Sequence, residues 1–246
     1  MVGVKEKKKV CWLSAGVSSF VAGYLAENVD EFLYIDIENQ HPDSMRFIKE
    51  CERVLNAKVQ ILKSPYGSVE NIIRQFRYIN GPRGAKCTEV LKKRVRKEWE
   101  AAHRQYDLTY VWGFDLSERE RADRLLEAMP DFGHEFPLID HMLTKQDAHA
   151  VLAEFGIRRP VMYDLGYQNN NCVGCVKGGM GYWNRIRIDF PAVFHKMAAL
   201  EREIGHSCIN GVYLDELDPK RGKMEDEIMQ DCGIMCWLTL NEAPDK

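Results

Sequence analysis

Two groups of residues have the side-chain types and the spacing of functional sites, one for binding an anion and one for binding a metal ion or cluster. One is a run of small residues, Ser-Ala-Gly-Val-Ser-Ser at positions 14–19, between an apolar stretch and a helical segment. The amides of such a loop and the positive end of a helix favour an anion. The other is the Cys-x-x-Cys pair of Cys172 and Cys175, set near glycines, with a second pair, Cys232 and Cys236, near the C-terminus. Such pairs are typical ligands of Zn²⁺ or of an iron–sulfur cluster.

Both groups also have simpler interpretations. Residues 14–19 lack the Gly-Lys-Ser/Thr ending of a Walker A loop and the G-x-G-x-x-G pattern of a dinucleotide site. Taken alone, they slightly favour an ordinary turn before a helix that Ser18 or Ser19 would cap. The cysteines could form a redox dithiol or be packed structural residues. For the cysteines, we favour the binding of a metal ion or an iron–sulfur cluster over a redox dithiol or a structural role.

The elements that must position these residues follow from the apolar pattern. Apolar stretches at residues 9–13, 31–37, 58–62 and 107–113 predict strands, with helical segments between them. This alternation predicts an α/β fold, a mostly parallel sheet flanked by helices. Ligands in such sheets lie beyond the carboxyl ends of the strands, which groups residues 14–19, 36–41 and 113–119 around one crevice. Beyond about residue 130 the alternation fades. We therefore expect a nucleotide-binding core at residues 1–130 and a cysteine-bearing C-terminal extension or lid at residues 131–246.

A basic helical segment at residues 84–97 follows the third predicted strand. Cys87 lies near its start beside Lys86, and the helix terminus and the lysine both favour the reactive thiolate. Lys92, about one turn further, would lie on the same side and pair with phosphate or sulfate oxygens. The simpler interpretations are a buried small residue for Cys87 and a solvated basic face for residues 92–97. A clamp on a polynucleotide backbone is a further one.

Three short motifs in chain order resemble the N-type ATP pyrophosphatase superfamily, which includes phosphoadenylyl-sulfate (PAPS) reductases and ATP-dependent sulfurtransferases. Ser14, Gly16 and Ser19 match its pyrophosphate loop S-G-G-x-D-S, with Ala15 in place of a glycine and Ser18 in place of the aspartate. The other two motifs are a Cys…Leu-Lys segment after the third strand and a Gly-x-Arg-x-x-Glu-Ser segment after the fourth. The residues that carry these matches are Cys87, Thr88, Leu91, Lys92, Gly113, Glu118 and Arg119.

The resemblance implies an adenine nucleotide alpha-hydrolase-like fold and a PAPS reductase-like enzyme. Such an enzyme binds ATP or an adenylyl sulfate (PAPS or APS) and reduces or transfers sulfur, here with Cys87 and Lys92 as catalytic residues. The resemblance and the crevice together predict these nucleotide-binding residues: Ser14, Ala15, Gly16, Val17, Ser18, Ser19, Asp36, Gly113, Glu118 and Arg119.

The resemblance also suggests a set of metal ligands. Adenylyl-sulfate reductases with a 4Fe–4S cluster use a Cys-Cys pair where this chain has Lys86 and Cys87, plus a later Cys-x-x-Cys. The implied ligands of a 4Fe–4S cluster or Zn²⁺ are Cys87, Cys172 and Cys175, with Cys232 or Cys236 as the fourth. The fourth position could instead stay open for a sulfur atom, as in ATP-dependent tRNA thiolases.

Composition narrows the class of protein further. The chain has 246 residues, of which 45% are hydrophobic and 29% charged, as is typical of a soluble globular protein. A net charge of −3 gives no electrostatic case for bulk nucleic-acid binding. The N-terminus is too polar for a secretory signal and no apolar run is long enough to span a bilayer, so we expect a cytoplasmic location and no membrane partner. The eight cysteines are then better interpreted as thiols or metal ligands than as disulfides.

Three functions stay open on the sequence. The first is the sulfur-handling enzyme, and the second is a nucleotide-binding module that lost catalysis, for which Ser18 in place of the aspartate is the best argument. The third is a zinc-stabilised protein that contacts nucleic acid through residues 92–97. Candidate partners are an adenine nucleotide, a nucleic-acid or small-molecule sulfur acceptor, and a second copy in a homodimer. Mg²⁺ is a further candidate ion, although the acidic segment 215–219 is better interpreted as a turn.

Overall fold

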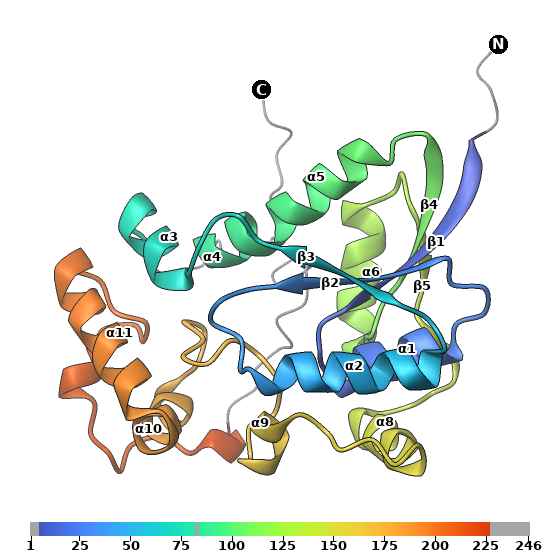
Figure 1. Cartoon of the computed structure of the whole chain (residues 1–246). Helices are drawn as coiled ribbons and strands as arrows, with labels where there is room; N and C mark the ends of the chain where they lie inside the picture. Colours follow the sequence, from blue (N-terminus) through green and yellow to red (C-terminus); the bar gives the residue numbers. More distant parts are fainter. Residues whose placement is uncertain (1–4, 82–83, 227–246) are drawn as a thin grey trace.

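A computed structural model describes residues 5–81 and 84–226, and its centre is a five-stranded parallel sheet (Figure 1). The strand order is β3-β2-β1-β4-β5, and every neighbouring pair is parallel. The bounds are β1 (Glu6–Leu13), β2 (Glu31–Asp36), β3 (Val59–Lys63), β4 (Tyr106–Val111) and β5 (Gly133–Glu135). The predicted α/β fold with a mostly parallel sheet is confirmed, and β1 to β4 coincide with the four predicted strands. β5 was not predicted, because three residues are too short to show a period.

Helices connect the strands and continue beyond them. In the first part of the chain they are α1 (Val17–Leu25), α2 (Asp43–Leu55), α3 (Val69–Phe76), α4 (Lys86–Thr88), α5 (Val95–Ala102) and α6 (Arg119–Ala128). A π-helical turn, η1 (Glu89–Arg94), joins α4 to α5. Later helices are α7 (Pro137–Asp140), α8 (Lys145–Glu154), α9 (Val161–Asp164), α10 (Met180–Asp189) and α11 (Pro191–Ile204). Short 3₁₀ turns are η2 (Leu116–Glu118), η3 (Leu214–Glu216) and η4 (Met224–Asp226).

The sheet is buried on both faces because side chains alternate along each strand. In β1, Val10 and Trp12 join one apolar cluster, whereas Cys11 and Leu13 join another. The second cluster includes residues of α1, α2 and α8, and the first includes residues of α5 and α6. This two-sided burial explains why the predicted strands read as continuous apolar runs.

The chain changes direction across the sheet at β1. From β1 it moves outward through β2 to β3, and then returns to add β4 on the other side of β1. In open α/β sheets, ligands bind beyond the carboxyl ends of the strands at such a switch point. The segments that follow β1 and β4 therefore define where a ligand site is expected.

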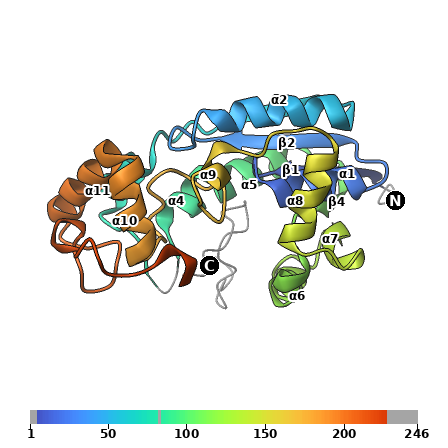
Figure 2. The same ribbon diagram turned by 90° about the horizontal axis from the view of Figure 1, so that it is seen from below.

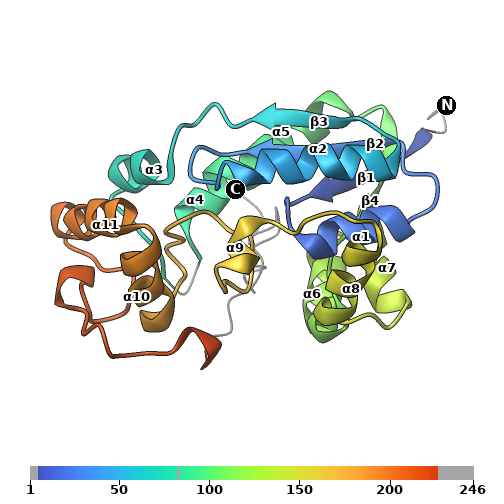
Figure 3. The ribbon, with the colours of Figure 1, turned by 60° about the horizontal axis from the view of Figure 1, so that its bottom comes forward.

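The C-terminal half of the chain has two parts. β5 pairs with β4, and α8 packs against the α1 side of the sheet, so the α/β core extends past the predicted boundary at residue 130. Two views place α10 and α11 at one end of the molecule and α6, α7 and α8 at the other, with α9 between (Figure 2, Figure 3). The cysteine-bearing segment thus leads from α9 to α10. None of the helices in the described ranges combines the length and apolarity that crossing a membrane requires.

Asp43 ties the start of α2 to the start of α9. Pro42 is the N-cap of α2, so Asp43 and Ser44 lie inside its first turn. The Asp43 carboxylate accepts hydrogen bonds from Arg46 at 2.6 and 2.8 Å and from the N–H of Val161 at 2.8 Å. The bond from Arg46 is the main cause that lowers the pKa of Asp43 to about 2.

We expect Asp43→Asn to lower the free energy of unfolding by about 2 kcal/mol at pH 7. Because the pKa of Asp43 is depressed in the folded protein, its contribution is present above the ordinary pKa and is lost as the pH falls towards 2. The difference from wild type, measured by urea unfolding at several pH values, should therefore shrink between about pH 4 and pH 2. The exposed Asp123 provides the control, since Asp123→Asn should change stability little at any pH. A constant Asp43→Asn deficit across this pH range would contradict the prediction.

Candidate functional site

Residues 14–19, which we name the serine loop, connect β1 to α1 and are held together by their own hydrogen bonds. The Oγ of Ser19 accepts the backbone N–H of Ser14 at 3.0 Å and donates to the carbonyl of Gly16 at 2.9 Å. The Oγ of Ser14 lies 3.1 Å from the Oγ of Ser19 and accepts the N–H of Gly16 at 3.2 Å. Two hydroxyls thus join the end of β1 to the first turn of α1.

The start of α1 leaves helix amides at the carboxyl edge of the sheet. Gly16 is the N-cap and no side chain caps the helix, so the predicted capping by Ser18 or Ser19 is wrong. Both serines lie in the first turn, where helix N–H groups have no intrahelical acceptor. Ala15 adopts a left-handed φ of 56°, which costs an L-residue about 1–2 kcal/mol. The loop therefore holds a strained shape that directs amides and helix dipole at one spot.

Gly113 follows β4 and lies directly against the serine loop. A Cβ at Gly113 would stand 2.5 Å from the Cα of Ser19 and 2.6 Å from its backbone nitrogen. Only glycine permits this approach of one backbone to another. The segments after β1 and β4 therefore meet at the switch point, where the crevice was predicted.

Three consecutive asparagines, Asn169, Asn170 and Asn171, connect the C-terminal segment to this loop. The Asn170 side chain donates through Nδ2 to the carbonyl of Ala15 and to the Oγ of Ser44, both at 2.9 Å. Lys145 of α8 donates to the Oδ1 of Asn169. All three asparagines are buried. The asparagines were not predicted as site residues, although three adjacent amides immediately before a Cys-x-x-Cys pair can be seen in the sequence.

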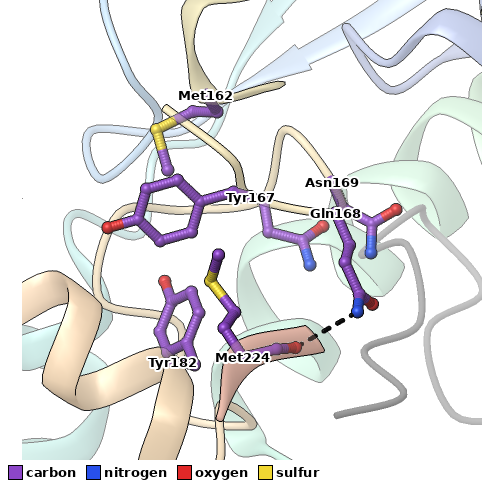
Figure 4. Close-up of a pocket in the computed structure, with 7 residues that line it drawn as sticks. Met162, Tyr167, Gln168, Asn169, Tyr182 and Met224 are labelled. Atoms are coloured by element: carbon purple, nitrogen blue, oxygen red, sulfur yellow. Dashed lines mark hydrogen bonds between the residues drawn. The ribbon is translucent and has the colours of Figure 1, made fainter. Parts of the chain in front are cut away.

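A pocket lies beside the asparagines. Its lining combines aromatic rings, two methionines and amides: Met162, Tyr167, Gln168, Asn169, Asn171, Tyr182 and Met224 (Figure 4). The rings of Tyr167 and Tyr182 meet edge to face with their centroids 5.6 Å apart, and Gln168 donates to the carbonyl of Met224. The asparagines therefore lie between the serine loop and this pocket, since Asn170 contacts Ala15 and its two neighbours line the pocket.

Tyr34, near the end of β2, is subject to the charges of Asp36, Lys92 and Cys172. Burial is the main cause that raises the pKa of Tyr34, Asp36 and Cys172 raise it further, and Lys92 lowers it. These three groups therefore act electrostatically on the same phenol. Lys92 is buried in the π-helical turn η1, a distortion that is frequent at functional sites.

Burial of Lys92 and Arg96 corrects the interpretation of residues 92–97 as one solvated basic face. Arg96 ion-pairs with Glu100 at 3.4 Å and is only 5% exposed. Arg94 and Lys97 are exposed, so only part of the run faces solvent. A continuous basic face for nucleic acid is therefore not present along this segment.

The segment after β4 begins with a capping box. Asp115 accepts the N–H of Ser117 at 2.9 Å, and Glu118 reaches back to the N–H of Asp115. Glu118 also pairs with Arg121 at 2.5 Å, and the guanidinium of Arg121 lies 4.4 Å from the ring centre of Phe114. Arg121 is buried whereas the predicted Arg119 is exposed, so Arg121 is the arginine built into this edge of the sheet.

The Cys-x-x-Cys segment is a tight turn held by one tyrosine. The hydroxyl of Tyr182 accepts the N–H of Cys175 at 2.9 Å and donates to the carbonyl of Cys172 at 3.2 Å. The N–H of Val173 donates to the carbonyl of Asn39, in the loop after β2, at 2.8 Å. Both cysteines are buried, and neither forms a disulfide within the described residues. The turn is therefore attached to the carboxyl edge of the sheet.

Cys87 and Cys208 lie in the same apolar region as this turn. Cys87 is half-buried and packs against the cluster that contains Cys172, Cys175 and Cys208. Burial raises the pKa of Cys208 most, with further contributions from Glu201 and Cys87. Cys208, which was not predicted as a site residue from the sequence, is thus a buried thiol on which Cys87 acts electrostatically.

The predicted metal site is not assembled by the described residues. Within residues 5–81 and 84–226, no group of three His, Cys, Asp or Glu side chains is placed to hold a metal ion. Cys232 and Cys236, the predicted fourth ligands, lie outside the described residues. No reaction step is therefore assigned to a metal or cluster.

Comparisons with known proteins give a match among solved structures alone. No protein-family model matches the sequence, and no curated protein matches it. Among solved structures, the chain is similar to a PAPS reductase from Candida auris, crystallised as a phosphate complex, with 13% identity and a TM-score of 0.47. The match covers 70% of this chain and 82% of that one.

Proposed function

We propose that this protein is a PAPS reductase-like enzyme that binds ATP or an adenylyl sulfate at the serine loop. The observation that carries the proposal is the position of that loop. It lies at the switch point of a parallel sheet, it presents the N-terminus of α1, and the backbone of Gly113 closes one side of it. This combination is suited to the phosphates of a nucleotide.

The second part of the proposal is sulfur-related reduction or sulfur transfer that uses a cysteine. Support comes from the position of the Cys172 turn, because the N–H of Val173 bonds to the carbonyl of Asn39 in the loop after β2. An activated group on a nucleotide must meet its acceptor without diffusing into water, which favours a cysteine at this edge. Cys87 and Lys92 stay the proposed catalytic pair. A cluster or zinc that includes Cys232 or Cys236, an Mg²⁺ ion, a homodimer and a nucleic-acid acceptor also stay predictions.

Calorimetric titration with ATP, PAPS and AMP tests the nucleotide site. We expect ATP and PAPS to bind wild-type protein more tightly than AMP, because the loop recognises a chain of phosphate or sulfate groups. Failure of all three to bind would end the proposal. Assay of sulfite release from PAPS with a dithiol reductant then separates an enzyme from a binding module that lost catalysis.

Ser19→Ala provides the sharper test of the loop. The change removes one Oγ that accepts the N–H and the hydroxyl of Ser14 and donates to the carbonyl of Gly16, so the loop loses three hydrogen bonds. We expect about tenfold weaker ATP binding, from roughly 1.4 kcal/mol of lost loop organisation. The matched control is Ser68→Ala, which removes the N-cap of α3 and should cost about 1 kcal/mol of stability without affecting ATP. Equal ATP affinity in both variants would remove the serine loop from the site.

A further inference from the structure

We infer that Asn170 is a positioning residue for the serine loop, so that the cysteine-bearing segment controls the affinity of the nucleotide site. The inference rests on the proposed function, because it concerns the same loop. It goes beyond it by naming a residue 155 positions away in the chain that holds the loop in its binding shape.

The hydrogen bonds of one peptide unit carry the argument. The carbonyl of Ala15 accepts from Asn170 at 2.9 Å, and the N–H of Gly16, on the same peptide plane, donates to Ser14 at 3.2 Å. Because the peptide is planar, these two bonds at its opposite edges fix its rotation. That rotation sets the direction in which the next amides, at the start of α1, leave the loop.

The orientation of the Asn170 amide follows from the same contacts. A carbonyl can only accept, so the atom that faces Ala15 must be the donor Nδ2. Among residues 5–81 and 84–226 no group then pairs with the Oδ1 of Asn170, which is buried in a residue that is only 3% exposed. A buried acceptor without a partner is costly, which indicates that the donor end is what this position requires.

Backbone strain at Ala15 explains why the loop needs the hydrogen bond from Asn170, which we call the clamp. Ala15 holds a φ of 56°, which an alanine rarely adopts without support from its surroundings. The clamp supplies that support and extends to α2 through the second bond of Asn170, to the Oγ of Ser44. Cys172 follows Asn170 by two residues, so ligand at the loop and order in the cysteine turn should be linked in both directions.

Calorimetry with ATP on four variants tests the inference. Asn170→Ala should weaken ATP binding about tenfold, since the loop loses the bond that orients its amides. Ala15→Gly in the Asn170→Ala background should recover most of that loss, because glycine adopts the left-handed conformation without strain. Ala15→Gly alone supplies the reference affinity against which the recovery in the double variant is measured. This recovery distinguishes positioning of the loop from a general loss of packing.

Asn184→Ala is the matched control. Asn184 is buried and donates through Nδ2 to the carbonyls of Asp218 and Arg221, at 2.9 and 2.8 Å. Like Asn170, it has no partner for its Oδ1 in the part of the chain that the structure describes. We expect it to lose stability as Asn170→Ala does and to keep wild-type ATP affinity. Equal affinities in the two variants, or no recovery with Ala15→Gly, would overturn the inference while wild-type binding still supports the proposed function. Absence of ATP binding by wild type would instead overturn the proposed function, and the inference with it.

The reciprocal effect supplies a second readout. ATP should slow alkylation of Cys172 and Cys175 by iodoacetamide in wild type by at least severalfold, measured by mass spectrometry of the peptide. In Asn170→Ala at saturating ATP this protection should be lost, because the connection between loop and turn is broken. Equal protection in the two proteins would contradict the linkage.

Discussion

Replacing Gly113 with alanine should destabilise the protein by about 3 kcal/mol and abolish ATP binding at the serine loop. The added Cβ would stand 2.5 Å from the Cα of Ser19 and 2.9 Å from the carbonyl carbon of Ser18. These are backbone atoms at the start of a buried helix, so no side-chain rotation can relieve the contact. Overpacking of this kind costs about 1–3 kcal/mol where neighbours can move, and the upper end applies here.

Urea unfolding and calorimetry with ATP measure the two parts of this effect. Gly156→Ala is the control, because it places a methyl group in open space at a positive φ of 65°. It should cost only the strain of that conformation, about 1 kcal/mol, and leave ATP affinity unchanged. If Gly113→Ala kept wild-type affinity in a folded protein, the close approach of the two loops would have no part in binding.

Glu201→Ala should have an effect of similar size on stability, about 4 kcal/mol. Glu201 is fully buried in α11, and its carboxylate accepts the N–H of Cys208 and the N–H of Leu214, the latter at 2.6 Å. Alanine would leave both amides buried without an acceptor, and each such group costs about 1–3 kcal/mol. The chain between Cys208 and Leu214 would lose its attachment to α11.

Glu201→Gln separates these hydrogen bonds from the charge. Burial is the main cause that raises the pKa of Glu201, and the two amides oppose it. Relative to the unfolded chain, the folded protein therefore holds the proton of Glu201 more tightly. The contribution of Glu201 to stability is full below its ordinary pKa and declines as the pH rises through the raised value. Glutamine keeps one acceptor and cannot ionise. It should cost less than alanine and remove this part of the pH dependence, which urea unfolding between pH 4 and pH 8 measures. A loss below 1 kcal/mol for Glu201→Ala would show that the two amides find other partners.

The positions of four strands along the chain and the place of the serine loop could be predicted from the sequence. Strands buried on both faces must be apolar throughout, so β1 to β4 stand out as runs between helical segments. Parallel strands bring their carboxyl ends to one edge, and this places residues 14–19 and Gly113 near each other without any knowledge of side-chain contacts. The loop could be singled out because its function depends on small residues in consecutive positions.

Contacts between distant segments could be decided only by the tertiary structure. Asn170 contacts Ala15 from 155 residues away. Glu201 contacts Cys208 only because the chain turns back after the end of α11. Burial of Lys92 and Arg96 likewise depends on which side of the η1–α5 segment faces the sheet, which a run of basic residues does not reveal. A polar side chain has the same local pattern whether it faces water or a partner. Its role is set by the surface that packs against it, and that surface exists only once the chain has folded.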